Sequence, residues 1–309
     1  MFHAVMVRMF RKWHRRIALG AIKSRLPFIP TLRRWKRRLN GYEPHPANIG
    51  STLDDLTQLY RLMHTHGRRF HGTVLEIGTG WFPVAGIVAR LAGADRVILT
   101  DIVPNMDNET FLTAVRIVIE QIDDISKRFD LDPDTARSFL ERARIPADLA
   151  MIYNAPMDLM NLPDGSLDIV MSRACLEHIP VSELKALMAL LFGKIREGGI
   201  MAHAIDNSDH LAQVDPTISR LNFLTWTTGK HRVISYLRNG GENRLRHHEY
   251  ANLFRQAGYS LIASEAFIPE NVLSCVPSLR LVEPYSSMTA EQLAAVTSWY
   301  VVGRLPAAV

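Results

Sequence analysis

The stretch from residue 73 to residue 104, TVLEIGTGWFPVAGIVARLAGADRVILTDIVP, decides the fold of this chain. Its first five residues, Thr73–Ile77, are apolar or β-branched, as is typical of a strand buried in a parallel sheet. The next three, Gly78-Thr79-Gly80, include two glycines that tolerate positive φ. The sequence therefore predicts that the strand ends in a tight turn.

A helix and a second strand are predicted after this turn. Pro83 suits the first turn of a helix, and apolar residues at helical spacing continue to Gly93. Val97–Thr100 then predicts a second strand, which ends at Asp101. Because ligands of open α/β sheets bind outside the carboxyl ends of the strands, we expect Glu76, the glycine turn and Asp101 to face one crevice.

Two nucleotide chemistries are compatible with such a crevice. A dinucleotide-binding turn needs a third glycine where Pro83 stands, although Asp101 lies at the distance expected of its ribose-binding acid. The other is the turn E-x-G-x-G, here Glu76 to Gly80, which resembles that of class I S-adenosylmethionine-dependent methyltransferases. Their ligand carries ammonium and sulfonium groups, which a carboxylate attracts. Taken by itself, this motif is also compatible with a glycine turn that binds no ligand and has only a structural role.

Three further motifs follow in the order found in that methyltransferase family. Asn154-Ala-Pro-Met-Asp158 is similar to its adenine-contacting loop. The segment from Leu162 to Ile179 resembles its LPxxxFD motif, fourth strand and "LEH" loop, with Leu167 in place of the usual Phe. Glu197-Gly-Gly-Ile200 resembles the turn that opens its fifth strand. Four motifs in the expected order make a chance match improbable.

This resemblance implies S-adenosyl-L-methionine as the cofactor and a Rossmann-like methyltransferase fold. The fold class is α/β, with a doubly wound, mostly parallel sheet of seven strands. The last two strands, expected at 259–265 and 296–302, would form an antiparallel hairpin at the sheet edge. The cofactor-binding residues it implies are Glu76, Gly78, Thr79, Gly80, Asp101, Ile102, Asn154, Ala155, Ser172 and Arg173.

The remaining elements divide the chain into a basic extension with a linker, residues 1–50, and a methyltransferase domain, residues 51–309. The domain would carry insertions at 106–148 and 207–245. A Ser51 or Thr52 cap predicts a first helix that extends to Arg69. Further helices are expected at 107–129, 133–144 and 181–195, and further strands at 149–153, 167–172 and 199–205.

Composition indicates a globular protein, with 309 residues of which 47% are hydrophobic. The two cysteines, Cys175 and Cys275, are too few for a disulfide framework and lack metal-ligand spacing, which suits a reducing compartment. Cys175, next to the end of the fourth strand, is expected to be a packing residue rather than a nucleophile.

Positive charge is concentrated at the N-terminus. Residues 1–42 hold 12 of the 36 Lys and Arg residues and no acid, which leaves 24 basic against 31 acidic residues in the rest of the chain. Two basic amphipathic helices are expected there, separated by a break at 27–30. The apolar positions are Met6, Phe10, Trp13 and Ile17 in the first helix and Leu32, Trp35 and Leu39 in the second.

Such helices suit an anionic membrane surface, and a helical cap on the fold with a solvated basic face is the alternative. Nucleic-acid binding is a weaker alternative, because the rest of the domain is acidic and has no basic stripe. No apolar run suits a secretory signal or a membrane span, so we expect a cytoplasmic protein, which the basic helices would allow to bind the inner face of the membrane peripherally. A mitochondrial transit peptide would contain more serine than the single Ser24.

Polar residues after the fifth strand are the candidates for acceptor binding, since the loops after strands four and five bind the acceptor in the resembled family. His203 to His210 includes two histidines and two carboxylates, and an aromatic insertion and the segment Glu242-Asn-Arg-Leu-Arg-His-His-Glu-Tyr250 follow. A similar segment occurs in methyltransferases associated with cell-surface polysaccharides. Aromatic faces beside polar groups suit a glycan or another hydroxylated acceptor. The predicted substrate-binding residues are Asp206, Asp209, Trp226, Arg244, Arg246 and His247.

Methyl transfer requires alignment and, for a poorly acidic hydroxyl, a base. His178, His203 and His210 are the predicted bases. Alternatively, Asp206, Asp209 and His210 bind a hard divalent cation, or the cluster is structural. The sequence thus predicts O-methylation of a glycan or related hydroxylated acceptor, without an assigned metal site. A membrane-docked methyltransferase of small molecules or lipids, or a non-catalytic cofactor-binding module, are the alternatives.

Overall fold

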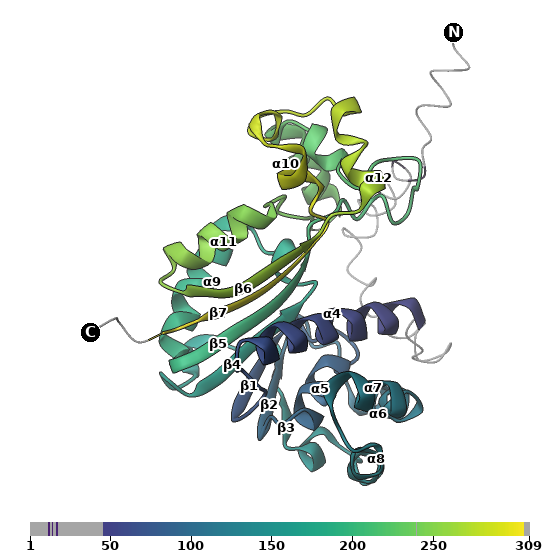
Figure 1. The fold of residues 1–309 in the computed structure, drawn as a ribbon, viewed down its shortest axis with the longest axis vertical. Helices are drawn as coiled ribbons and strands as arrows, with labels where there is room; N and C mark the ends of the chain where they lie inside the picture. The colour runs from purple at the N-terminus through teal and green to yellow at the C-terminus, as the bar shows by residue number, and fades with distance from the viewer. Residues whose placement is uncertain (1–11, 13, 15–16, 18–45, 239, 306–309) are drawn as a thin grey trace.

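A mostly parallel sheet of seven strands forms the centre of the molecule (Figure 1). The structure is a computed structural model that describes residues 12, 14, 17, 46–238 and 240–305. The strand order is β3-β2-β1-β4-β5-β7-β6, and β7 is antiparallel to both of its neighbours. The strands are β1 (Thr73–Ile77), β2 (Arg96–Thr100), β3 (Met151–Tyr153), β4 (Leu167–Arg173), β5 (Ile195–Asp206), β6 (Ser260–Phe267) and β7 (Thr297–Gly303). The predicted α/β fold class is confirmed.

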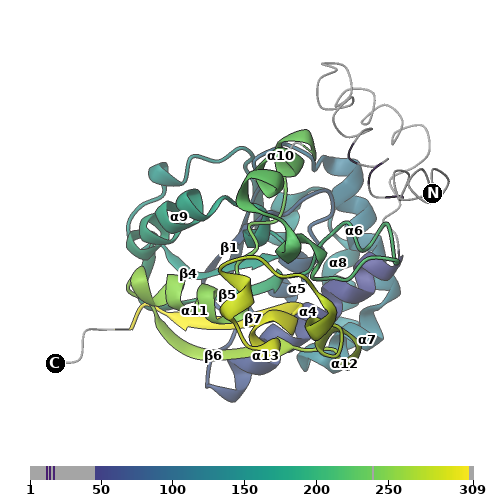
Figure 2. The ribbon, with the colours of Figure 1, turned by 90° about the horizontal axis from the view of Figure 1, so that it is seen from above.

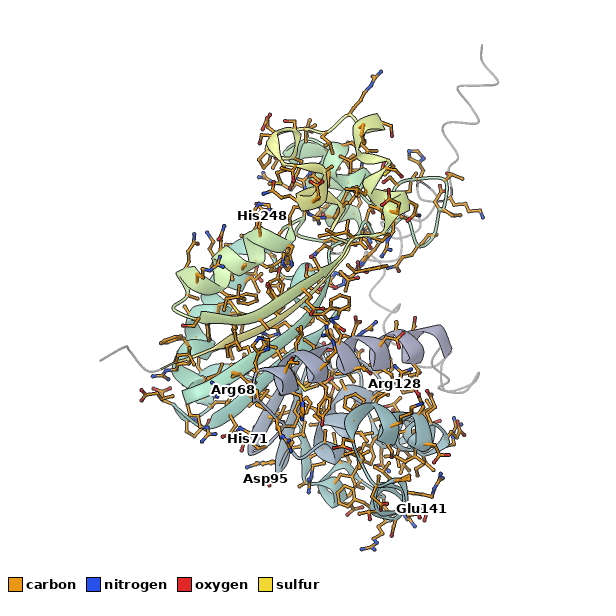
Figure 3. The ribbon with its side chains drawn as sticks, viewed as in Figure 1. Arg68, His71, Asp95, Arg128, Glu141 and His248 are labelled. Atoms are coloured by element: carbon orange, nitrogen blue, oxygen red, sulfur yellow. The ribbon has the colours of Figure 1, made fainter. Side chains whose placement is uncertain are left out.

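Helices cover both faces of the sheet, because successive strand residues point to opposite sides and both sides are apolar. Val74 packs in one core and Leu75 in the other. The first face is covered by α4 (Pro46–Thr65), α5 (Val84–Leu91), α6 (Asn108–Glu120), α7 (Ile122–Phe129) and α8 (Pro133–Glu141), and the second by α9 (Val181–Lys194) and α11 (His247–Gln256) (Figure 2). Arg128 ties α7 to α4 through an ion pair of 2.7 Å with Asp54 (Figure 3).

A third group of helices, which we call the cap, lies beyond the ends of β5, β6 and β7 (Figure 1). It consists of residues 207–246 and 268–296 and has its own apolar core, which includes Phe223, Trp226 and Tyr285. Its helices are α10 (Thr228–Arg238), α12 (Glu270–Leu273) and α13 (Ala290–Ala294), with 3₁₀ turns at Asn222–Thr225, Val276–Ser278 and Tyr285–Ser287. The predicted insertion at 207–245 therefore packs with a second segment, between β6 and β7, that was expected to be a hairpin connection.

Several predicted boundaries are wrong. The first helix begins at Pro46, and Ser51 and Thr52 lie inside it, where both hydroxyls donate to the carbonyl of Asn48. The helix predicted at 107–129 is interrupted at Gln121, which ends α6 and precedes α7. The third strand begins only after a 3₁₀ turn at Pro146–Leu149, and β5 extends back to Ile195, where it pairs with Leu167.

Most of the basic extension, including the predicted break and linker, lies outside the described residues. Of its predicted apolar positions, Ile17 is described, and it is buried in the core of the cap. Lys12 is exposed. In the described part of the chain, no helix combines the length and the apolarity that crossing a membrane requires.

Candidate active site

A cavity of about 510 Å³ lies at the carboxyl ends of β1, β2 and β4. It is where the sequence places the cofactor crevice, because parallel strands all end on the same side of a sheet. Its size is within the range of small-molecule sites. The lining residues are Ile77, Gly78, Gly80, Thr100, Asp101, Ile102, Pro156, Met157, Leu159, Ala174, Cys175, His178, Ile179 and Leu187.

The glycine turn and Asp101 form the polar end of this cavity. Gly78 and Gly80 have φ values of 81° and 68°, so both positions favour glycine. A Cβ atom at Gly78 would lie 2.5 Å from the sulfur of Cys175, whereas one at Gly80 would enter open space. The Asp101 carboxylate accepts hydrogen bonds from the backbone N–H groups of Gly80 (2.8 Å) and Val103 (3.1 Å). These bonds fix the carboxylate at the cavity wall.

This cavity fits S-adenosylmethionine. Its apolar wall, formed by Met157, Leu159 and Leu187, suits the adenine ring, and Asp101 suits the ribose hydroxyls. The open space beside Gly80 leaves the backbone accessible to the methionine portion. The residues that would hold the cofactor are thus the predicted Gly78, Gly80, Asp101 and Ile102, together with the loop 156–159.

Glu76 is not part of the cavity wall. Its side chain is buried beneath α5, and burial raises the pKa of its carboxyl group to about 8. The backbone N–H of Gly86 is its hydrogen-bonding partner, while Oε2 has none. A Cβ atom at Gly86 would lie 2.8 Å from that oxygen. In this arrangement the carboxyl group contacts helix α5, not a ligand in the cavity.

The other residues implied for the cofactor lie beside the cavity. The N–H of Asn154 bonds to the carbonyl of Leu99 at 3.0 Å, which continues the β2–β3 pairing into the loop that contains Ala155. Thr79 is buried in the glycine turn. Ser172 is buried, with its hydroxyl 2.8 Å from His203 Nδ1.

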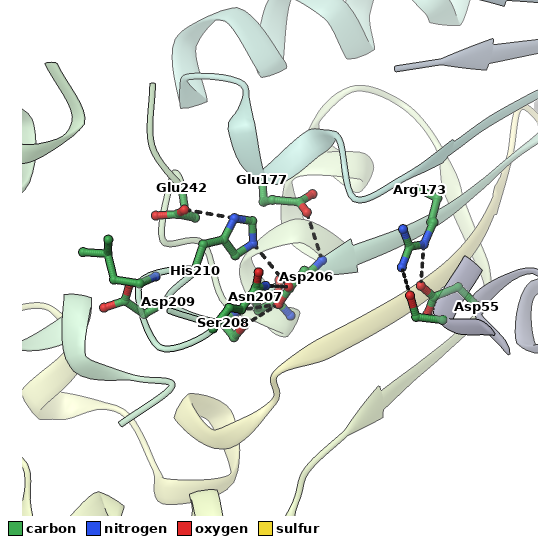
Figure 4. A network of polar contacts seen from close by, with 12 residues as sticks. Asp55, Arg173, Glu177, Asp206, Asn207, Ser208, Asp209, His210 and Glu242 are labelled. Carbon is green, nitrogen blue, oxygen red and sulfur yellow. Dashed lines mark hydrogen bonds and ion pairs between the residues drawn. The ribbon is translucent and has the colours of Figure 1, made fainter. Parts of the chain in front are cut away.

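Arg173 points toward α4 instead of the cavity. Its Nε donates to the Asp55 carboxylate at 2.8 Å, and Nη2 donates to Ser51 (Figure 4). Trp299 also donates to Asp55, at 3.0 Å. Arg173 therefore joins the end of β4 to α4 and β7.

His178 brings a titratable group to the cavity. It ends a short 3₁₀ turn, Leu176–His178, that follows β4. The desolvation of its ring and the nearby His210, whose ring centre lies 5.0 Å away, lower its pKa. Asn243, from the segment after α10, holds this turn in place: its side chain donates to the carbonyls of Leu176 (2.9 Å) and Ile179 (3.0 Å).

His210, the neighbour of His178, lies between two carboxylates (Figure 4). Its Nδ1 is 3.0 Å from Glu242, and its Nε2 is 3.2 Å from Asp206. Although burial opposes the charge, these carboxylates raise the pKa of His210 to about 10. A histidine with that pKa is protonated at neutral pH and cannot accept a proton, so this geometry argues against the predicted role of His210 as a free general base.

Two other predicted residues of the cluster point elsewhere. His203 is fully buried, stacks on Phe254, and has a pKa lowered to about 3 by burial. It therefore does not reach the cavity as a base. Asp209 is also buried, and its carboxylate accepts from the N–H of Leu211 (2.9 Å) and the amide of Asn222 (3.2 Å). The predicted cation site of Asp206, Asp209 and His210 is not assembled.

The arginines predicted to bind substrate are buried in the cap, where they hydrogen-bond to backbone carbonyls. Arg246 is fully buried and donates to the carbonyls of Asn207, Leu293 and Arg244. Arg244 donates to the carbonyls of Phe223 (3.1 Å) and Trp226 (2.8 Å). In these positions the guanidinium groups satisfy backbone acceptors and are shielded from an acceptor molecule.

Trp226 and His247 are equally structural in this conformation. Trp226 is 3% exposed and belongs to the apolar core of the cap. His247 stacks on Tyr300 with ring centres 5.0 Å apart, and its Nδ1 lies 3.0 Å from the hydroxyl of Ser298. Neither lines the cavity, so the predicted aromatic acceptor platform is not present in this arrangement.

The prediction missed three residues that shape the site, namely Glu177, Glu242 and Asn243. Glu177 is 1% exposed, and burial raises the pKa of its carboxyl group to about 8. Glu242 binds both His210 and Arg238. The available signal was their position inside the LEH and ENRLR motifs, but only the folded chain places these motifs side by side.

Comparisons with known proteins agree with this geometry. The model of a family described as "Methyltransferase domain" matches residues 53–264, more than half of the chain. A comparison with curated protein sequences found no significant match.

Solved structures with a similar fold include an S-adenosylmethionine-dependent methyltransferase from Mesorhizobium loti, at 14% identity and TM-score 0.46, covering 82% of this chain and 100% of that one. Another is phosphoethanolamine N-methyltransferase 2 of Haemonchus contortus, solved with S-adenosylmethionine, at 14% identity and TM-score 0.45. That match covers 81% of this chain and 52% of the longer one.

The match to the family model, over a sheet with the expected strand order and a cavity that fits the cofactor, establishes the class of the protein. The chain belongs to the methyltransferase-domain family and is an S-adenosylmethionine-dependent methyltransferase.

Proposed function

We propose that this enzyme methylates a hydroxyl oxygen of a glycan or another hydroxylated acceptor. The observation that carries the proposal is the position of His178, which lines the cofactor cavity and has Glu177, His210 and Asp206 behind it. Hydroxyl groups are weak nucleophiles and need help in losing their proton, whereas a neutral amine does not. A cluster of titratable groups beside the methyl donor therefore suits a hydroxyl acceptor, which must lose its proton, better than an amine.

The cofactor, when bound, supplies a methyl group for in-line displacement from its sulfonium. The chain aligns the two reactants: the glycine turn and Asp101 hold the donor end, and His178 faces the space left for the acceptor. The acceptor proton leaves toward the cluster around His178. The apolar cavity wall excludes water from the transfer.

The glycan class rests on the ENRLR segment, whose resemblance is to methyltransferases of cell-surface polysaccharides. Arg244, Arg246 and Trp226 are buried, so direct contact between these side chains and a glycan does not support this class. The segment retains a link to the site, because Glu242 and Asn243 hold His210 and the His178 turn.

Transfer of a labelled methyl group tests the proposal. The purified enzyme would be incubated with labelled S-adenosylmethionine and either cell-envelope glycan fractions, simple polyols and phenols, or amine acceptors of matched size. We expect label in an alkali-stable ether of a hydroxylated acceptor, and at least about 10-fold less with Asp101→Asn when the cofactor concentration is below the dissociation constant of the variant. Label confined to amines would contradict O-methylation, and label in no acceptor would favour a non-catalytic cofactor-binding module.

An acceptor at an anionic membrane surface is the second candidate. It is supported by the 12 basic residues and no acid within residues 1–42. Burial of Ile17 in the cap supports the other interpretation, in which this segment covers the fold. On the first interpretation the enzyme is cytoplasmic and peripheral on the inner membrane face, and binding to anionic vesicles distinguishes the two.

A further inference from the structure

Three side chains beside the cofactor cavity present metal-ligand atoms to one another. These are Glu177 and His178, from the turn after β4, and His210, from the loop after β5. One ligand atom from each lies within 4.8 Å of the other two. Bound to one ion at about 2.1 Å, such atoms lie roughly 3.3 Å apart, so small side-chain rotations would close the site.

Glu177 supplies an independent sign that this cluster lacks a partner. The residue is 1% exposed, and its Oε2 atom has no hydrogen-bonding partner. Its other oxygen, Oε1, accepts one long bond of 3.4 Å from the N–H of Asp206. A buried carboxylate oxygen without a partner is costly and therefore rare, unless an ion or another ligand binds it.

His210 is oriented as metal-bound histidines are. Its Nδ1 is 3.0 Å from Glu242, whose carboxylate is in turn held by Arg238 through two bonds of 3.0 and 3.1 Å. Metal ligands of this kind donate the N–H of one ring nitrogen to a carboxylate, and the other nitrogen loses its proton when it binds the ion. In His210 the ion would displace the Nε2 proton, which would pass to solvent. The other nitrogen, Nε2, faces Asp206 at 3.2 Å (Figure 4).

Asp206 places a further oxygen next to His210. Its Oδ1 accepts from the N–H and hydroxyl of Ser208 at 2.9 and 2.6 Å, which fixes the carboxylate with Oδ2 toward His210. Its side chain is 23% exposed. Glu177, Asp206 and Glu242 thus place three carboxyl groups around the two imidazoles, so oxygen and nitrogen ligands are available close together.

We propose that Glu177, His178 and His210, with Asp206 as an additional oxygen ligand, bind one divalent cation of the first transition series. Two imidazoles and a carboxylate suit Zn²⁺, Mn²⁺, Fe²⁺ or Co²⁺ better than Mg²⁺ or Ca²⁺, which prefer oxygen ligands throughout. Of these ligands His178 lines the cavity, so a coordination position left open on that side would be accessible to a substrate.

The role of this cation rests on the proposed function. An ion at this site adjoins the cavity through His178, so it would coordinate an acceptor hydroxyl and lower the pKa of that hydroxyl. The oxygen would then attack the methyl carbon as the carbon–sulfur bond breaks, and its proton would leave past the carboxyl groups of this cluster to solvent. This replaces the predicted base catalysis by histidine with metal-assisted deprotonation.

Direct metal binding tests the site independently of any acceptor. The full-length, untagged enzyme, treated with chelator and dialysed, would be titrated with Co²⁺ and with Mn²⁺ by calorimetry, and Co²⁺ would also be followed by visible absorption. We expect one equivalent to bind, with a Co²⁺ spectrum of low coordination number. Glu177→Gln and His178→Ala should each weaken binding by about 100-fold, and Glu242→Gln by roughly 10- to 100-fold because the carboxylate that orients His210 is lost.

His64→Ala and Glu120→Gln are matched controls, because both residues are exposed and far from the cavity in sequence and fold. They should bind Co²⁺ as the wild-type enzyme does. Wild-type affinity in Glu177→Gln and His178→Ala, or no saturable binding to the wild-type enzyme, would overturn the site and leave a cluster of ion pairs. Binding of S-adenosylhomocysteine, measured in the same variants, reports whether the fold is intact. Metal binding without methylation of any hydroxyl would contradict only the proposed function.

Discussion

The backbone N–H of Gly80 donates a hydrogen bond of 2.8 Å to the carboxylate of Asp101. This bond joins the turn after β1 to the end of β2, two points 21 residues apart in the chain. Asp101 is the only acidic side chain among the described residues that line the cavity. The bond holds it beside the backbone of Gly80, which a ligand can reach. The donor end of the active site therefore depends on both residues together.

Replacing Asp101 should weaken cofactor binding without unfolding the protein. Asp101→Asn removes the charged acceptor for ribose hydroxyls, a loss of about 1.5–3 kcal/mol, or roughly 10- to 100-fold in affinity. Calorimetry with S-adenosylhomocysteine measures the change. Asp95→Asn, at the other end of β2, is the control, since Asp95 is exposed and bonds only to the N–H of Gly72 among the bonds seen here (Figure 3). Equal affinity in both variants would argue against this cofactor geometry.

Asn243→Ala should destabilise the turn that carries His178. The variant loses the bonds to the carbonyls of Leu176 and Ile179, and also those that its Oδ1 accepts from Leu245 and Tyr250, at a cost of about 1–3 kcal/mol or more. We expect a lower melting temperature and slower methyl transfer. Asn252→Ala, whose side chain is exposed on α11, should change neither. A turnover number unaffected by Asn243→Ala would show that the turn does not need this tie.

His203 should make the fold acid-sensitive. Its folded-state pKa, about 3, lies below the value of 6.5 for the unfolded chain, so below pH 6.5 the unfolded chain binds a proton that the folded protein does not. Its contribution is fully present above pH 6.5 and falls by up to about 1.4 kcal/mol per pH unit toward pH 3.

His203→Gln, which does not titrate, should reduce the stability difference between pH 7 and pH 5 by about 2 kcal/mol. Urea unfolding at the two pH values measures this. The variant should also be less stable at pH 7, because the stacking on Phe254 is lost. An unchanged pH dependence would mean that the pKa of His203 is the same in the folded and the unfolded protein.

Arg246→Met separates the structural role of this arginine from the predicted substrate contact. Loss of its bonds to the carbonyls of Asn207, Leu293 and Arg244 should lower the free energy of unfolding by about 3 kcal/mol or more. Arg255→Met, on the exposed side of α11, should cost little. Chemical denaturation measures both. A fully stable Arg246→Met enzyme with a raised KM would restore the substrate-binding interpretation.

Basic residues of the N-terminal extension should bind anionic vesicles if the enzyme docks on a membrane. Arg8, Arg11 and Arg15, all changed to Gln, should lose about 1 kcal/mol each, or more than 100-fold in vesicle affinity together. Ile17 is kept, so its packing in the cap is not altered. Sedimentation with vesicles at low and high salt is the measurement. A control that neutralises the exposed Arg142, Lys185 and Arg255 should still bind; identical, salt-insensitive binding by both variants would contradict electrostatic docking.

The sequence by itself determined the sheet and the donor end of the site, because these depend on local patterns. The two central strands are apolar runs, Thr73–Ile77 and Val97–Thr100. The turn after the first has positive φ at residues 78 and 80, which is why both are glycine. The carboxyl ends of parallel strands lie at the same edge of a sheet, so the position of Asp101 near that turn follows from the topology. Local sequence patterns also predicted most of the helices. The errors lie at helix ends, such as the predicted cap at Ser51, and at breaks such as Gln121, where the residues have similar propensities to continue or to end a helix.

Only the tertiary structure decided which polar residues reach the cavity. His203 and Asp206 are three residues apart on or at the end of one strand, yet one is fully buried against Phe254 and the other faces His210. Arg246 resembles a surface residue in sequence but satisfies backbone carbonyls inside the cap. Whether a histidine or an arginine is exposed depends on packing from segments far away in the chain, including residues 268–296, and that long-range burial sets its charge and its function.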